Sequence, residues 1–147
     1  MKKQRMFPLL LIILLVVLDQ ISKYFFYDQE LRSSLPFLEP LLNTGISWGI
    51  QISAPLIIGI SLVCVVLFGY LYYKKFLSFW EISLFIAGTV GNLLDRFFWG
   101  GVRDFISLGN FPVFNLADAF LTAAVALLCI REFFLLKRPK KKLDSTE

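Results

Sequence analysis

The chain has 147 residues, of which 57% are hydrophobic and 18% charged, and its formal net charge is +4. A mean hydropathy of +0.70 and apolar stretches long enough to cross a bilayer exclude an ordinary soluble domain and predict a small polytopic membrane protein. The positive charge does not indicate nucleic-acid binding, because the basic residues form short runs instead of a folded basic face. These runs, at residues 2–5, 74–75 and 137–142, are typical of the cytoplasmic ends of membrane helices.

The first apolar stretch, PLLLIILLVVL, follows a basic flank and resembles a secretory signal peptide. No small-residue cleavage site follows it, so we expect a retained membrane helix at about residues 7–27 with its amino terminus in the cytoplasm. Asp19 and Lys23 lie four residues apart near the outer end of this helix and share one helical face. They form either an intrahelical ion pair at the interface or part of a polar site.

Residues 28–55 are expected to form the first outer segment, in which acidic residues outnumber basic ones. From Gly45 to Ser53 apolar and polar residues alternate, and this period of two predicts a half-buried strand on the outer leaflet. Trp48 within this strand suits the membrane interface. Asn43 and the two residues after it are typical of a turn.

The second helix is predicted at about residues 55–73, because this stretch is almost wholly apolar. The third helix, at about residues 78–97, has small residues at every fourth position, which permits close contact with another helix. Its outer end holds Asn92, Asp95 and Arg96, which share one face because they lie at i, i+3 and i+4.

The second outer segment, at about residues 98–112, contains glycine turn signals around VRDFISL. A fourth helix is expected at about residues 113–136, with residue 115 as an alternative start, followed by a basic cytoplasmic tail at residues 137–147. The expected fold class is an all-α membrane protein with four transmembrane helices and a small outer-leaflet β element between helices 1 and 2. Both termini would be cytoplasmic, and residues 1–147 would form one domain because neither a repeat nor a linker is present.

The chain contains no histidine, which excludes Ser-His-Asp and Cys-His nucleophile arrangements and the usual histidine-bearing zinc sites. Cys64 and Cys129 lie inside apolar segments without a CxxC pair, so both are expected to be buried, unreactive thiols. Hydrolysis by this chain would therefore depend mainly on carboxylates.

Residues 91–118 join two apolar segments, yet they are rich in Asp, Asn and Arg. Ionisable groups at membrane depth are costly, so chemistry is expected in this stretch. Alone, Asp104 could be a solvated loop charge, and Asn115 and Asp118 are spaced like a helix N-cap and its N3 acid. Two carboxylates that meet would share a proton, and one could then accept a proton from water while the other donates to a carbonyl oxygen. The spacing alone does not establish that the two carboxylates meet.

Five blocks, in order, resemble the signature blocks of the lipoprotein signal peptidases, also called signal peptidase II. The blocks are DQISK at 19–23, NTGISWG at 43–49, GNLLDR at 91–96, VRDFI at 102–106 and FNLAD at 114–118. This resemblance covers nearly the whole chain and implies an aspartic endopeptidase whose catalytic dyad is Asp104 and Asp118. It also implies residues that bind substrate or support the site, namely Asp19, Lys23, Asn43, Gly45, Trp48, Asn92, Asp95, Arg96 and Asn115.

The resemblance implies a bacterial prolipoprotein substrate whose cysteine carries a diacylglyceryl group, cut amino-terminal to that cysteine. The implied location is the bacterial cytoplasmic (inner) membrane, with the site near the outer leaflet, where a lipid-modified substrate stays. No metal or organic cofactor is implied, because water is the nucleophile. The expected partners are the substrate and membrane lipid, with no nucleic acid, and the chain is expected to be a monomer. Arg96 would either orient a carboxylate or bind a substrate carbonyl.

Two other classes of protein remain open on the residues alone. A small proton-coupled transporter or channel would place polar residues through the full depth of the membrane. Here the second helix has few polar residues at its centre, and the acids gather at one side. A non-catalytic scaffold would explain the small-residue helix faces but not the collected Asp and Asn side chains. The pattern favours the peptidase, with the transporter as the alternative.

Overall fold

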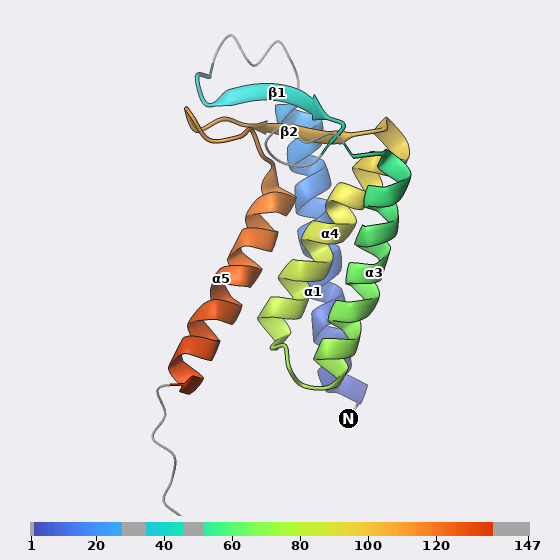
Figure 1. Ribbon diagram of the computed structural model, residues 1–147, viewed down its shortest axis with the longest axis vertical. Helices are drawn as coiled ribbons and strands as arrows, with labels where there is room; N and C mark the ends of the chain where they lie inside the picture. Colours follow the sequence, from blue (N-terminus) through green and yellow to red (C-terminus); the bar gives the residue numbers. More distant parts are fainter. Residues whose placement is uncertain (1, 28–34, 46–51, 137–147) are drawn as a thin grey trace, which may run out of the picture.

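The computed structural model describes residues 2–27, 35–45 and 52–136, with side chains from residue 8 onward. Four long helices run along its long axis, and a two-stranded sheet lies across one end (Figure 1). The elements are α1 (Lys2–Phe26), β1 (Leu38–Asn43), α3 (Ala54–Tyr73), α4 (Phe79–Trp99), β2 (Val102–Ile106) and α5 (Leu116–Leu136). α4 packs against α1, α3 and α5, whereas α5 leans away from the other helices toward its carboxyl end (Figure 1).

Three of the described helices are long and apolar enough to cross a membrane. They are Pro8–Phe26 within α1, and α3 and α5 over their full lengths, with mean hydropathies of 2.1, 2.4 and 2.1. α4 has 21 residues, but its buried face includes polar and charged side chains. The protein is therefore a mostly helical membrane protein with three candidate spans and a small sheet, and the count of four spans stays a prediction.

The contacts of α4 follow from its small residues, as the sequence predicts. Ser83, Ala87 and Gly91 are all buried. A Cβ atom added to Gly91 would lie 2.5 Å from Asp19 Oδ2, and one added to Gly88 would lie 2.5 Å from the carbonyl oxygen of Ala117. Side chains at these two positions would hold α1 and α5 away from α4.

The sheet differs from the predicted β element, because it joins both outer segments. β1 pairs antiparallel with β2, with Leu41 opposite Asp104 and Asn43 opposite Val102. β1 therefore ends at Asn43, where only a turn was predicted, and β2 was not predicted as a strand. Neither strand shows a period of two, since LEPLLN is irregular in burial and VRDFI is buried on both faces. Most of the strand predicted from Gly45, including Trp48, lies outside the described residues.

α5 begins at Leu116, next to the later of its two predicted starts, because Phe114 is still extended and pairs with Ile106 in an isolated bridge. One further prediction needs correction. Cys64 is half-buried and Cys129 is exposed, so the prediction that both thiols are buried is wrong. Their helices, α3 and α5, have mostly exposed apolar side chains, as a lipid-facing surface requires.

Candidate active site

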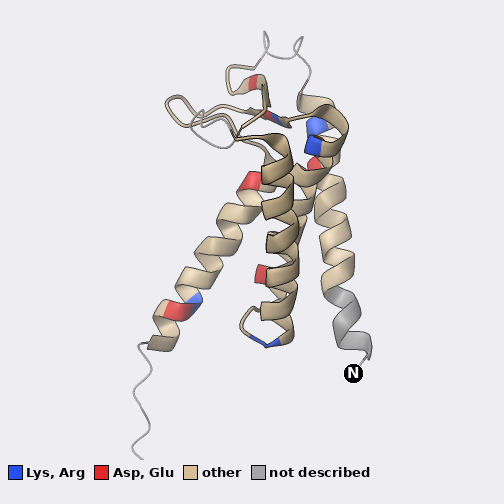
Figure 2. Cartoon of the chain, turned by 45° about the vertical axis from the view of Figure 1, so that its right-hand side comes forward, with Lys and Arg blue, Asp and Glu red and all other residues tan. Residues whose placement is uncertain are grey.

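The chain returns on itself between Asp104 and Asp118, and this return brings the two carboxylates to one place. β2 ends at Ile106, and its backbone N–H donates to the carbonyl oxygen of Phe114 at 2.8 Å, while the Phe114 N–H donates back to Ile106 at 3.0 Å. Asn115 follows directly and becomes the cap of α5. As a result the middle of β2 lies beside the first turn of α5, in the region next to the sheet where Figure 2 shows several positions of acidic and basic residues.

Asn115 is bonded to both carboxylates. Its Nδ2 donates to Asp104 Oδ1 at 2.6 Å, and its backbone N–H donates to Asp118 Oδ2 at 3.2 Å. Its Oδ1 accepts from the Asp118 backbone N–H at 3.0 Å, which completes a reciprocal helix cap. The spacing of these residues therefore serves the helix cap and the carboxylate pair together. Asp104 is 1% exposed and Asp118 is half-buried.

All four carboxylate oxygens accept from neutral amide N–H groups. Asp104 Oδ2 accepts from Asn43 Nδ2 at 3.0 Å, and Asp118 Oδ1 accepts from Asn92 Nδ2 at 2.8 Å. The other two oxygens accept from Asn115. Amide donors fix the positions of both side chains without adding a cation to either of them.

The pKa of the Asp104 carboxyl is raised to about 7, chiefly by burial and further by the charge of Asp118. The N–H groups of Asn43 and Asn115 and the charge of Lys23 lower this pKa by smaller amounts. Asp104 therefore holds a proton for much of the time near neutral pH, as one member of a close carboxylate pair should.

A second polar cluster lies behind the pair, centred on Lys23. Its Nζ atom is 2.8 Å from Asp19 Oδ2 and 3.4 Å from Asp95 Oδ2, and all three side chains have no exposed surface. Asp19 Oδ1 also accepts from the backbone N–H of Ala117 at 2.9 Å, so α1 supplies a cap to α5. Asp19 and Lys23 are thus an intrahelical ion pair that also faces the site, and both sequence interpretations apply.

Sequence reasoning missed two members of this cluster, Gln20 and Arg103. Arg103 donates to the Asp95 carboxylate through its backbone N–H at 2.9 Å and its Nη2 at 2.8 Å, and its guanidinium lies 4.9 Å from the ring centre of Trp99. Gln20 Nε2 donates to Asp95 Oδ1 at 3.2 Å. Side chains of consecutive residues on a strand point to opposite faces, so a strand prediction for VRDFI would have placed Arg103 and Asp104 on opposite faces.

Arg96 and Gly45 lie at the rim of the site. Arg96 Nη2 donates to the carbonyl oxygen of Gly45 at 3.3 Å, and the Gly45 backbone N–H donates to Asn43 Oδ1 at 3.1 Å. Arg96 therefore binds a backbone carbonyl, but one of its own chain. Trp48, the remaining predicted site residue, lies outside the described residues.

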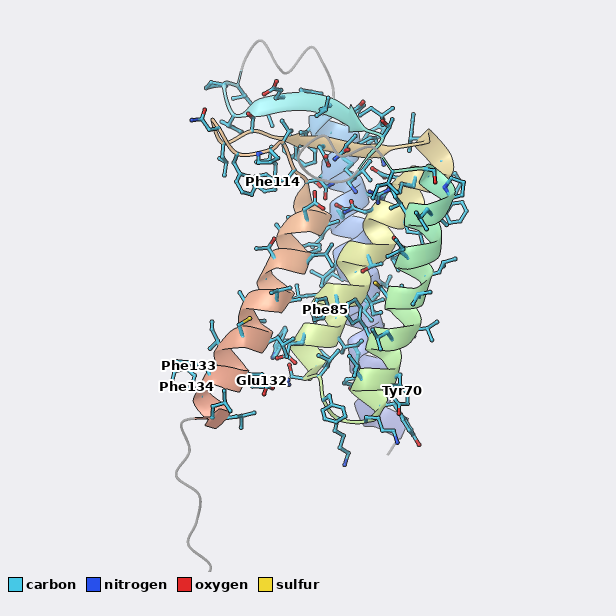
Figure 3. All side chains as sticks on the ribbon, viewed as in Figure 1. Tyr70, Phe85, Phe114, Glu132, Phe133 and Phe134 are labelled. Carbon is cyan, nitrogen blue, oxygen red and sulfur yellow. The ribbon has the colours of Figure 1, made fainter. Side chains whose placement is uncertain are left out.

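The carboxylate pair opens into a cavity of about 930 Å³ lined by α3, α4, α5 and the segment before α5. Asn92, Arg96, Asp104 and Asp118 line its polar end. The rest is mainly apolar, and it extends from Phe114, just before α5, to Phe85 in the first half of α4 (Figure 3). Within residues 2–27, 35–45 and 52–136 no group of three or more His, Cys, Asp or Glu side chains could hold a metal ion.

Fold and site together define a membrane protein in which a buried and a half-buried carboxylate face a mainly apolar cavity. The family model described as signal peptidase (SPase) II matches residues 11–134, and this chain belongs to that family of membrane peptidases. The lipoprotein signal peptidase of Rickettsia felis is 40% identical, over 87% of this chain and 74% of the relative. That of Thermodesulfovibrio yellowstonii is 34% identical, over 79% of this chain and 87% of the relative.

The fold is similar to that of solved structures as well. One is a bacterial membrane enzyme determined by the in meso method at 2.3 Å resolution, which matches with a TM-score of 0.74 and 27% identity. The match covers 95% of this chain and 94% of that one. A second bacterial membrane enzyme, determined at 1.9 Å, matches with a TM-score of 0.68 and 28% identity over 90% of this chain and 94% of that one.

Proposed function

We propose that this protein is an aspartic endopeptidase that removes signal peptides from diacylglyceryl-modified prolipoproteins, cutting amino-terminal to the lipidated cysteine. The observation that carries this proposal is the bonding of Asp104 and Asp118 to one residue, Asn115, at the polar end of an apolar cavity. Membership of the signal peptidase II family supports the reaction class, and the relatives that are lipoprotein signal peptidases support the substrate.

The two carboxylates differ in ways that assign their roles in this mechanism. Asp104 is deeply buried, with its pKa raised to about 7, so it is the acid that donates a proton to the oxygen of the scissile carbonyl. Both carboxylates line the cavity, but Asp118 is the more accessible, so it is the base that takes a proton from water as the water oxygen attacks the carbonyl carbon. The proton on Asp118 then passes to the leaving nitrogen, and Asp104 recovers its own proton as the carbonyl re-forms.

The cavity fits a substrate that stays in the membrane. Its apolar walls on α3, α4 and α5 suit hydrocarbon, whether acyl chain or signal-peptide side chains. At its polar end, the Asn92 amide and the Arg96 guanidinium could bind backbone groups of the substrate, which would otherwise lose their hydrogen bonds to water without replacement. A scissile bond next to a lipidated cysteine would therefore lie at the junction of the two parts.

We further propose that α1, α3, α4 and α5 all cross the bacterial inner membrane, with both termini cytoplasmic. The start of α1, the turn with Lys74 and Lys75, and the end of α5 lie at the end of the molecule away from the sheet (Figure 1). Basic residues at that end support a cytoplasmic location, which puts the carboxylate pair near the outer leaflet. A reporter fused after residue 147 should be cytoplasmic, and an external signal would contradict this orientation.

The test is cleavage of one lipobox peptide in detergent, with and without the diacylglyceryl group. Wild-type protein should cut only the lipidated peptide, and both Asp118→Asn and Asp104→Asn should abolish cutting while remaining folded. Glu132→Gln, a change to a carboxylate on α5 whose side chain is 53% exposed, is the matched control and should keep full activity. No cleavage by folded wild-type protein would contradict the proposal, and a proton-flux assay in vesicles would then test the transporter alternative.

A further inference from the structure

The first helix reaches the carboxylate pair without taking part in the cavity. None of the described side chains of α1 lines the cavity. Lys23 nevertheless contacts Asn92, which in turn donates to Asp118. We propose, on the basis of the proposed function, that Lys23 is a positioning residue that fixes the Asn92 side-chain amide in the orientation that donates a hydrogen bond to Asp118.

The partners of Asn92 leave only one orientation for its amide. The oxygen end faces two donors, Lys23 Nζ at 3.0 Å and Asn115 Nδ2 at 3.1 Å. The nitrogen end faces the Asp118 carboxylate, with Nδ2 2.8 Å from Oδ1. A lysine ammonium has no acceptor, so the reversed amide would place an NH₂ group against the ammonium and an oxygen against the carboxylate. Lys23 thus opposes the one rearrangement by which Asn92 could release Asp118.

The ammonium group is itself held in place from three sides. Its three N–H bonds face Asp19 Oδ2 at 2.8 Å, Asp95 Oδ2 at 3.4 Å and Asn92 Oδ1 at 3.0 Å. Arg103 on β2 fixes Asp95 in turn through contacts at 2.8 and 2.9 Å. The contact that satisfies the third N–H bond of this buried ammonium is with the residue that holds Asp118.

The charge of Lys23 has a second consequence, for the titration of Asp104. Lys23 contacts Asp19 on α1 and Asp95 on α4, and its charge acts on Asp104 on β2. The other charged groups of the site are Arg96 on α4, Arg103 on β2 and Asp118 on α5. The Lys23 charge lowers the pKa of Asp104. Loss of this charge should therefore move the alkaline limb of the pH–rate profile, where Asp104 loses its proton, to higher pH.

The experiment measures cleavage of the lipidated lipobox peptide by wild type and by Lys23→Met. Lys23 is buried outside the cavity, so KM should stay within about twofold while kcat falls by about 10²-fold, the scale expected for a displaced catalytic group. Lys74→Met, at the exposed turn after α3, is the control and should match wild type. In a double-mutant cycle, Lys23→Met should have little further effect on kcat in an Asn92→Ala background.

A charge-balanced variant distinguishes a loss of catalysis from a loss of folding. Lys23→Met combined with Asp19→Asn removes one cation and one anion and keeps an oxygen for the Ala117 N–H. This variant should fold, as judged by thermal melting in the same detergent, and should show the same fall in kcat. Wild-type kcat in a folded variant, or independent effects of Lys23→Met and Asn92→Ala, would overturn the proposal.

Two further outcomes are decisive. If both Lys23 variants unfold while Asp19→Asn alone folds, Lys23 is a structural residue and the proposal fails. If wild type itself cuts no lipidated peptide, the proposed function fails and the role of Lys23 fails with it. Active wild type with unaffected Lys23 variants would contradict the positioning role alone.

Discussion

Asp104→Asn should stabilise the protein at alkaline pH, although the proposed function predicts that it has no activity. Burial and the charge of Asp118 raise the pKa of Asp104 from 3.8 to about 7. A folded-state pKa above the unfolded one means that wild-type stability is fully present below about pH 4 and is lost as the pH rises through about 7. This rise in pKa corresponds to about 4 kcal/mol in the free energy of unfolding at pH 8, since each tenfold change in proton affinity is worth about 1.4 kcal/mol.

Asparagine at position 104 removes the free-energy cost of a buried negative charge but introduces a smaller cost, the loss of one hydrogen bond. Its side chain has one oxygen, so it can accept from Asn43 or from Asn115 but not from both in the present geometry. The unmatched amide should cost about 1–3 kcal/mol. The variant should therefore be more stable than wild type by about 1–3 kcal/mol at pH 8 and less stable than wild type at pH 4.

The assay is thermal unfolding of the purified protein in one detergent at pH 4, 6 and 8. A gain of 1 kcal/mol corresponds to roughly 2–4 °C in Tm for a chain of this size, so the change of sign should be measurable. Titrating groups that do not interact with Asp104 are common to both proteins and cancel in the difference. Glu132→Gln, whose side chain is 53% exposed, is the control and should differ little from wild type. A pH-independent difference for Asp104→Asn would refute the idea that ionised Asp104 is destabilising.

Two substitutions away from the carboxylate pair test the helix contacts. Gly91→Ala would place a Cβ atom 2.5 Å from the Asp19 carboxylate and should lower the free energy of unfolding by about 1–3 kcal/mol. The control is Gly59→Ala, whose added Cβ atom meets nothing within 4 Å and which should be neutral or stabilising in the same thermal assay. Arg131→Met should cost about 1–3 kcal/mol, because Glu81 is 1% exposed and loses its ion pair at 2.8 Å. A Tm equal to wild type for either Gly91→Ala or Arg131→Met would contradict the corresponding contact.

The helices and the polar stretch could be predicted because their signals are local. Long apolar runs predict α1, α3 and α5, and the i, i+3, i+4 spacing at the end of α4 places Asn92, Asp95 and Arg96 near one another. The buried strand and its partner could not be found in this way. Asn43 and Asp104 are separated by 61 positions, and their pairing depends on how two outer segments meet.

The meeting of Asp104 and Asp118 also depends on contacts that spacing does not reveal. The backbone bonds between Ile106 and Phe114 turn the chain back, and the Asn115 cap then joins both acids. The sequence permits this arrangement but equally permits a surface carboxylate and an ordinary helix cap. The family resemblance, not periodicity, placed the two acids together in advance.

The central position of α4 has a consequence for how the protein is made. Asn92 contacts Lys23 on the first helix and Asp118 on the last, so its oxygen can be paired as soon as α4 is made, whereas its NH₂ group has no Asp118 partner until α5 has been synthesised. α4 is also not one of the three described helices whose length and apolar composition suit a membrane span. We therefore expect the insertion machinery to hold α4 beside α1 until synthesis of the chain is complete, and quality-control proteases to degrade chains truncated before α5.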